Sequence, residues 1–113
     1  MKTRTINFAR DFTDCPGGRY AKYGEFSGEA FRDSVLLPAI EAHDLVILEM
    51  DGVLGFPASF LDEAFGILVE RIGREMFDRK LRIELTDNRI ALSEIRDCIA
   101  KHVEIANPTA VAA

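Results

Sequence analysis

The order of apolar patterns along the chain predicts a single α/β domain, in which a β-sheet with a parallel core is covered by helices. Short apolar segments of strand length alternate with longer segments whose apolar residues recur every three or four positions. The chain has 113 residues, of which 48% are hydrophobic and 29% charged, as expected for one folded domain. We therefore expect a domain over residues 1–107 and a frayed tail over residues 108–113.

The first strand is expected at residues 5–8, where apolar and polar side chains alternate. The sequence Pro16-Gly17-Gly18 predicts a turn, because glycine adopts positive φ angles without strain. Residues 19–23 then favour a short returning strand, which would complete a hairpin with a long loop.

The first long helix is expected from Ser27 to residue 42. Ser27 is a favourable N-cap, and Glu29 in the first turn suits the positive end of the helix dipole. Apolar residues recur on one side of this helix: Phe31, Val35, Leu36, Ala39, Ile40 and Ala42. Pro38 lacks a backbone N–H and clashes with the preceding turn, so we predict that the helix bends or splits near Leu37.

Residues 45–48 are all apolar, which predicts a central strand covered on both faces. A glycine-containing loop follows, and a second long helix is expected from Ser59 to Ile72. The Ser-x-x-Asp spacing predicts that the Ser59 hydroxyl caps this helix while Asp62 reaches back to the Ser59 amide. Gly73 is the expected end of the helix.

Residues 81–85 alternate apolar and charged side chains, which predicts a third strand buried mainly on one face. Residues 86–88 form a turn and cap cluster before a last helix. Four apolar residues at helical spacing define that helix: Leu92, Ile95, Ile99 and Val103.

Charge and composition exclude several classes of protein. Nineteen acidic residues outnumber fourteen basic ones and leave a net charge of −5, which argues against nucleic-acid binding. The basic start of the chain precedes no apolar segment, and no apolar segment is long enough to span a bilayer, so we expect a cytoplasmic protein without membrane contact. Cys15 and Cys98 lack the spacing of a metal site and are expected to be reduced thiols.

The sequence predicts no enzyme, no metal site and no cofactor. It contains neither a phosphate-binding loop nor a dinucleotide-binding glycine motif. His43 and His102 are isolated, so neither is expected to bind a metal. Asp62 and Glu63 are adjacent and would point in different directions from a helix, so we expect a cap and a solvated side chain rather than an acid/base pair.

An anion site is a second hypothesis. Arg19 and Arg32 flank the expected helix start at Ser27 and Gly28, where free backbone N–H groups favour negative charge. We predict that the two guanidinium groups share one electropositive spot. The alternative is a local ion pair of Arg32 with one of two nearby carboxylates, Glu25 or Glu29.

Two stretches of the chain carry a resemblance to a known family. The first is Gly18-Arg19-Tyr20, then Ser27-Gly28-Glu29-Ala30-Phe31-Arg32, then Leu37-Pro38. The second is Val46-Ile47-Leu48, then Gly52-Val53, then Ser59-Phe60-Leu61-Asp62-Glu63-Ala64-Phe65-Gly66. Together they resemble the STAS-like domains, relatives of the domain named for sulfate transporters and anti-sigma factor antagonists.

The resemblance implies a mixed β-sheet with helices packed chiefly on one side, and a regulatory role in partner switching. In anti-sigma factor antagonists a buried strand leads to Asp-Ser-Ser-Gly at a helix start, and the second Ser is phosphorylated. Those positions here are Pro57, Ala58, Ser59 and Phe60. Ser59 matches the phosphorylated residue, whereas the Asp and the Gly are absent. Capping and phosphorylation therefore remain two alternatives for the Ser59 hydroxyl.

The leading hypothesis is a regulatory protein-interaction module whose partner is a histidine-kinase-like ATPase or an anti-sigma-like protein. We expect it to bind through the loop at residues 55–59 and the exposed side of the following helix. The candidate contact residues are Phe56, Ser59, Phe60, Asp62 and Glu63. One rival is a sensor of a small anion or other ligand that uses Arg19 and Arg32. The other is an enzyme that uses Asp62 or Glu63 in a cleft.

Overall fold

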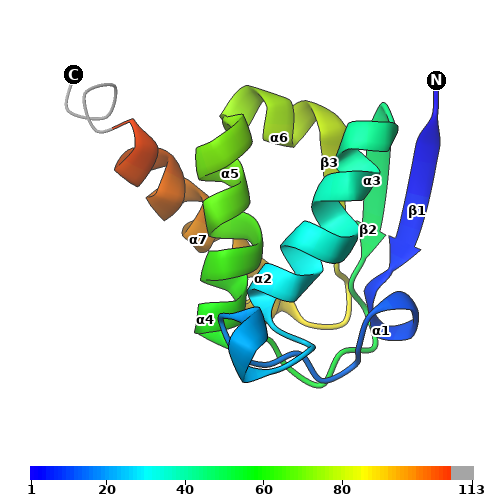
Figure 1. Cartoon of the computed structure of the whole chain (residues 1–113), viewed down its shortest axis with the longest axis vertical. Helices are drawn as coiled ribbons and strands as arrows, with labels where there is room; N and C mark the ends of the chain where they lie inside the picture. Colours follow the sequence, from blue (N-terminus) through cyan, green and yellow to red (C-terminus); the bar gives the residue numbers. More distant parts are fainter. Residues whose placement is uncertain (108–113) are drawn as a thin grey trace.

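Helices stack along one side of a three-stranded sheet in the computed structural model, which describes residues 1–107 (Figure 1). The strands are β1 (Thr3–Asn7), β2 (Leu45–Glu49) and β3 (Leu81–Glu84), in the spatial order β1-β2-β3. The predicted α/β fold class is confirmed. Both strand pairings within residues 1–107 are parallel, so this sheet is not mixed. The expected tail at residues 108–113 lies outside the described part of the chain.

The prediction of a returning strand at residues 19–23 is wrong. This segment contains a short 3-10 helix, η1 (Ala21–Tyr23), in place of a strand. The carbonyls of Gly18 and Arg19 accept hydrogen bonds from the amides of Gly28 and Glu29, at 3.1 and 3.0 Å. Amides at the start of a helix have no partner within the helix, so this segment satisfies them instead of pairing with β1.

The two faces of the sheet differ in burial. Val46 and Leu48 of β2 are fully buried beneath the helices, while Leu45 and Ile47 on the opposite face are only half-buried. The prediction that β2 is covered on both faces is therefore wrong. Parallel register places Ile6 and Ile83 beside Leu48, on the face that the helices cover. The helices therefore pack on one side of the sheet, as the resemblance implies.

Two long helical segments follow β1 and β2, and each contains a π-helical turn. After the short α1 (Phe8–Asp11), the first runs through α2 (Gly28–Phe31), η2 (Arg32–Leu36) and α3 (Leu37–Ala42). The second runs through α4 (Ala58–Leu61), η3 (Asp62–Gly66) and α5 (Ile67–Ile72). The η2 and η3 turns have the wider i→i+5 hydrogen bonding that often marks functional positions.

Pro38 follows the π-helical turn η2, and the backbone stays helical through Leu36 and Leu37, so the predicted split near Leu37 is wrong, although the α-helical hydrogen-bond pattern changes there. The amide of Leu37 bonds to the carbonyl of Arg32, so the α-helical pattern is broken in the turn before the proline. A wider turn relieves the clash between the proline ring and the preceding carbonyls. The same explanation does not apply to η3, which contains no proline.

Two more helices complete the described residues. The α6 helix (Arg74–Lys80) links α5 to β3 and was not predicted, whereas α7 (Arg89–Ala106) matches the predicted last helix. Gly73 ends α5 with a φ of 86°, a left-handed conformation that glycine adopts without strain. Within residues 1–107 no helix combines the length and apolar character needed to cross a membrane.

Aromatic side chains fill the core between the sheet and the first turns of both long helices. Phe8 contacts Phe31, Phe56 and Phe60, with ring centroids 4.8 to 5.8 Å apart. Phe60 is fully buried and Phe56 is nearly so. The hypothesis that these two residues bind a partner is therefore wrong, because their rings already pack in the core.

Candidate functional site

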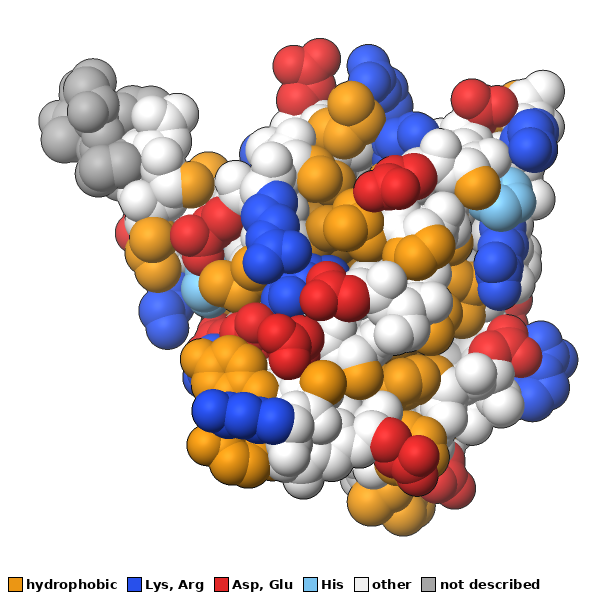
Figure 2. Space-filling model, viewed as in Figure 1, with side chains coloured by type: hydrophobic (Ala, Val, Ile, Leu, Met, Phe, Trp, Pro, Cys, Tyr) orange, Lys and Arg blue, Asp and Glu red, His pale blue; other side chains and the backbone are white. Residues whose placement is uncertain are grey.

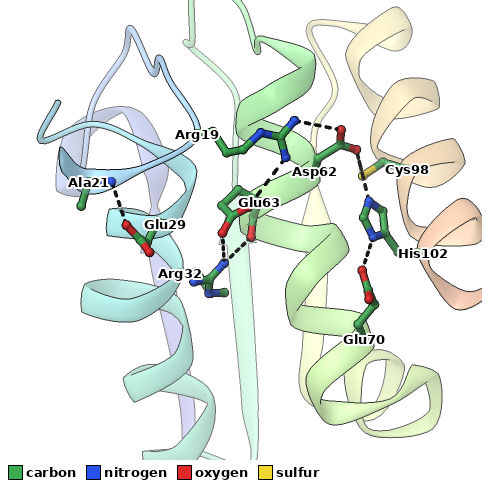
Figure 3. A network of polar contacts seen from close by, with 9 residues as sticks. All are labelled: Arg19, Ala21, Glu29, Arg32, Asp62, Glu63, Glu70, Cys98 and His102. Carbon is green, nitrogen blue, oxygen red and sulfur yellow. Dashed lines mark hydrogen bonds and ion pairs between the residues drawn. The ribbon is translucent and has the colours of Figure 1, made fainter. Parts of the chain in front are cut away.

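The candidate site is built around two consecutive carboxylates, Asp62 and Glu63, which begin η3. They project toward different neighbours, with Glu63 facing the helix of residues 28–42 and Asp62 facing α7 (Figure 3). Successive residues of a helix point about 100° apart, so the divergence follows from helix geometry. The solvated side chain expected for Glu63 is a wrong prediction, since Glu63 is buried.

Glu63 forms an ion pair with a buried arginine. Nη1 of Arg32 lies 3.0 Å from Oε1 of Glu63 and donates to the Glu63 carbonyl at 2.8 Å. The side chain of Arg32 is only 1% exposed, and its Nε donates to Asp33 at 2.9 Å. Burial alone would lower the pKa of Arg32, but the hydrogen bonds to Asp33 and Glu63 outweigh it and raise the pKa.

The structure brings Arg19 and Arg32 to the same carboxylate. Nη1 of Arg19 lies 3.7 Å from Oε2 of Glu63, and its Nη2 lies 3.5 Å from Oδ2 of Asp62. The two arginines lie together, but the prediction that they share an electropositive spot is wrong, because acidic side chains of the chain itself neutralise them. Charged side chains gather where the two long helices approach each other (Figure 2).

The helix start beside these arginines is closed by packing. The Ser27 hydroxyl accepts a hydrogen bond from the Ala30 amide at 3.1 Å, which confirms Ser27 as the N-cap. A Cβ on Gly28 would lie 2.5 Å from the carbonyl oxygen of Phe60, so glycine permits close contact between the two long helices. Ser27 and Gly28 are both buried, so this helix start is no open anion site.

Asp62 contacts a cysteine and a histidine of α7. Its Oδ1 accepts from Sγ of Cys98 at 3.3 Å and lies 3.3 Å from Nε2 of His102. Nδ1 of His102 contacts Oε2 of Glu70, a residue of α5 (Figure 3). Cys98 and His102 are buried, whereas Asp62 is partly exposed. A sulfur, a nitrogen and an oxygen, which are three types of metal ligand, thus lie within 4.8 Å of one another.

The thiol and the carboxylate of this cluster influence each other's protonation. Burial raises the pKa of Cys98 to about 12, and the hydrogen bond and charge of Asp62 add to this effect. Burial alone would also raise the pKa of Asp62, but hydrogen bonds from Cys98 and His102 outweigh it and leave the pKa below its ordinary value. The proton therefore resides on the sulfur, and the carboxylate is charged.

Gly66 makes room for the imidazole of His102. A Cβ at this position would overlap the ring, and the overlap would involve three of its atoms. The π-helical turn η3 thus begins with Asp62 and ends with Gly66, the glycine that leaves space for the His102 ring.

A groove of about 400 Å³ opens between α4 and α7 beside the cluster. Ala58, Leu61 and Cys98 provide its apolar lining, and charged residues complete it: Asp62, Glu94, Asp97 and Lys101. Cys98 and Asp62 belong to both the groove and the cluster, so the groove connects the cluster to solvent.

The predicted role of Ser59 as a cap is wrong. The helix begins one residue earlier, at Ala58, with Pro57 in the N-cap position and no side-chain cap. A proline disfavours helical backbone angles in the residue before it, so α4 does not extend beyond Pro57 toward the N-terminus. Asp62 therefore does not reach back to a Ser59 cap; its carboxylate contacts Arg19, Cys98 and His102. Ser59 itself is half-buried.

Hydrogen bonds join the loops that follow β2 and β3, which lead to α4 and α7. The carboxylate of Asp51 accepts from the amide and hydroxyl of Thr86, at 2.6 and 2.5 Å. The carboxylate of Asp87 also accepts a hydrogen bond from the Gly52 amide, at 2.8 Å. The loops extend from the carboxyl ends of neighbouring parallel strands, the edge where α/β sheets commonly bind their ligands.

Sequence reasoning missed Cys98, His102 and Glu70. One local signal was present, since Cys98 and His102 are four residues apart and so share one side of α7. Both cysteines are free thiols, as expected, with Cys15 exposed and Cys98 buried.

Comparison with known families adds one finding. Residues 27–91 match the family described as a STAS-like domain of unknown function (DUF4325). The chain belongs to this STAS-like family. The match begins at the Ser27 cap and ends in the first turn of α7, so it includes Asp62 and Glu70 but not Cys98 or His102. No curated protein and no solved structure matches the chain.

Proposed function

We propose that this STAS-like domain is a regulatory module that acts by binding a protein partner along the groove between α4 and α7. The observation that carries the proposal is the combination of this open groove with two exposed apolar side chains, each four residues before a residue that lines the groove. Leu54 in the loop before α4 is 80% exposed, and Ile90 in the first turn of α7 is 74% exposed. Large apolar side chains exposed beside a groove are typical of binding surfaces.

Ile90 and the groove share one side of α7. Residues 90, 94, 97 and 101 follow helical spacing, and the last three line the groove. Leu54 lies in the loop that leads to Ala58, and Ala58 belongs to the opposite wall of the groove. The hydrogen bonds of Asp51 and Asp87 join the loop after β2 to the loop after β3. Leu54 belongs to the first of these loops, and Ile90 follows the second.

Charge indicates the chemistry of the partner. Asp62, Glu94 and Asp97 outnumber the single cation Lys101 along the groove, and the whole chain has a net charge of −5. A segment with an apolar side chain next to Lys or Arg would complement this surface. From the STAS-like resemblance, we infer a histidine-kinase-like ATPase or an anti-sigma-like protein as the partner class.

Ser59 supplies a means of regulation within this proposal. It neighbours Ala58 of the groove wall and lies three residues before Asp62, on the same side of the helix. A phosphoryl group there would add negative charge next to the Asp62 carboxylate, and the repulsion would alter the groove.

The test is affinity capture with the purified chain as bait, followed by binding measurements with the captured protein. Leu54→Asp and Ile90→Asp should each weaken binding by more than about tenfold. Ile105→Asp is the matched control, because Ile105 is an exposed apolar residue near the far end of α7. Equal binding by all three variants would contradict the proposal, as would a captured protein of neither expected class.

A further inference from the structure

We propose that Asp62, Cys98 and His102 bind a divalent transition-metal ion of the Zn²⁺ class, with Glu70 orienting the histidine. Binding requires Cys98 as thiolate and Nε2 of His102 without a proton, so the Cys98 proton and the proton that Nε2 donates to Asp62 both leave to solvent as the metal–sulfur and metal–nitrogen bonds form. This inference does not require the proposed partner: the ligand set shares Asp62 and Cys98 with the groove but includes neither Leu54 nor Ile90, the residues varied in the partner test.

The spacing of the donor atoms suits a tetrahedral ion. Ordinary zinc bond lengths place neighbouring ligand atoms about 3.4–3.6 Å apart. Oδ1 of Asp62 lies 3.3 Å from Sγ of Cys98 and 3.3 Å from Nε2 of His102. The third separation is within 4.8 Å, so all three donor atoms lie close to the spacing of a single coordination shell.

The donor set selects the class of metal. Thiolate and imidazole ligands favour Zn²⁺ and its transition-metal neighbours, whereas Ca²⁺ and Mg²⁺ prefer oxygen ligands alone. Cys98 and His102 have the i, i+4 spacing that directs two ligands from one side of a helix. Asp62 completes the set from η3, a separate helix.

Glu70 has the position of an outer-sphere partner. Metal-binding histidines almost always donate their second ring N–H to a carboxylate or carbonyl, which fixes the tautomer and raises ligand basicity. Nδ1 of His102 contacts Glu70, leaving Nε2 directed at Asp62. Gly66 seats the imidazole in this orientation.

The groove supplies a fourth position. Asp62 and Cys98 line it, so an ion bound by three protein ligands would have one coordination position facing solvent. Glu94 and Asp97 on the same groove add negative charge that favours a cation. Three protein ligands with one open position allow water or an external ligand to complete the coordination sphere.

The experiment is a titration of the chelator-treated full chain with Co²⁺, followed by displacement with Zn²⁺. Thiolate coordination should produce a charge-transfer absorption band and tetrahedral visible bands at one Co²⁺ per chain. Zn²⁺ should abolish these bands and raise Tm by several degrees. Absence of the bands together with an unchanged Tm in the wild type would overturn the proposal without any variant.

Matched variants identify the ligands. Cys98→Ser should abolish the charge-transfer band, whereas Cys15→Ser should retain it, because Cys15 is the other free thiol and is remote in sequence from the cluster. Glu70→Gln should weaken metal binding by about 10- to 100-fold. Circular dichroism in chelator must show the same fold for each variant. A band that survives Cys98→Ser, or disappears in Cys15→Ser, would overturn the assignment.

Discussion

The helix of residues 58–72 contacts the helix of residues 28–42 through Glu63 and α7 through Asp62, and the two contacts differ in burial and in the chemistry of their partners. Glu63 is enclosed, with two arginines sharing its oxygens and Arg32 donating twice to the residue. Asp62 is partly exposed, lies on a groove and holds together a thiol and an imidazole. Two adjacent carboxylates thus have different roles: Glu63 forms a structural ion pair on one side of the helix, and Asp62 belongs to a cluster of candidate ligands on the other side.

A glycine accompanies each contact. Gly28 brings the helix of residues 28–42 against the backbone of Phe60, and Gly66 admits the His102 ring. The first contact is backbone against backbone, which resists rearrangement, and the second involves a side chain. The comparison indicates that the Glu63 side is rigid, while the Asp62 side is able to adjust to a ligand.

Glu63→Ala should have the largest effect on stability. It removes one of the two carboxylates paired with the buried guanidinium of Arg32, the other being Asp33, and breaking a buried ion pair costs about 3–5 kcal/mol. Urea unfolding monitored by circular dichroism measures the change. The control Glu84→Ala removes an exposed carboxylate and should cost less than about 0.5 kcal/mol. Comparable values for the two variants would mean that the Glu63 contact does not stabilise the fold.

Gly28→Ala and Gly66→Ala should each destabilise the chain by about 1–3 kcal/mol through overpacking. Gly28→Ala should be the more severe, because its Cβ would meet the Phe60 carbonyl rather than a side chain. Gly55→Ala is the matched control, since no atom lies within 4 Å of a Cβ there. Thermal unfolding of the three variants tests the order. A Gly66→Ala variant less stable than Gly28→Ala would reverse the comparison.

Asp62→Asn should cost only about 1 kcal/mol, although it neutralises the residue next to Glu63. The amide oxygen still accepts from Cys98, and the lost ion pair with Arg19 is long and partly exposed. Asp97→Asn, on the same groove, is the control and should have no measurable effect. Urea unfolding should therefore separate Asp62→Asn from Glu63→Ala by at least about 2 kcal/mol; equal losses would show that exposure does not distinguish the two carboxylates.

A third carboxylate, Asp51, extends the comparison to an exposed position, where the smallest effect is expected. Hydrogen bonds from the Thr86 side chain and then its amide hold the pKa of Asp51 below its ordinary value. A carboxylate with a lower pKa in the folded state stabilises the fold above its unfolded pKa and loses that contribution as the pH falls. Tm measured from about pH 5 to about pH 2 should therefore fall less in Asp51→Asn than in wild type. Parallel curves would show that these bonds contribute no stability.

Several elements were determined by the sequence itself. The Ser27 cap and the end of α5 at Gly73 both follow from backbone chemistry within one helical turn. The α/β class follows from the alternation of short apolar segments with helical patterns. The paired motifs also led to the STAS-like family, which the match over residues 27–91 confirms.

The candidate site was decided by tertiary structure. Asp62 lies 36 residues from Cys98 and 40 from His102, so no local pattern joins them. Even the start of α4 differs from the prediction, because Pro57 and not Ser59 occupies the N-cap position. Propensity and periodicity act over a few residues, which is enough to form helices and strands. Which side chains meet depends on how those helices pack, and here two glycines and two π-helical turns determine that Glu63 meets Arg32 while Asp62 meets Cys98 and His102.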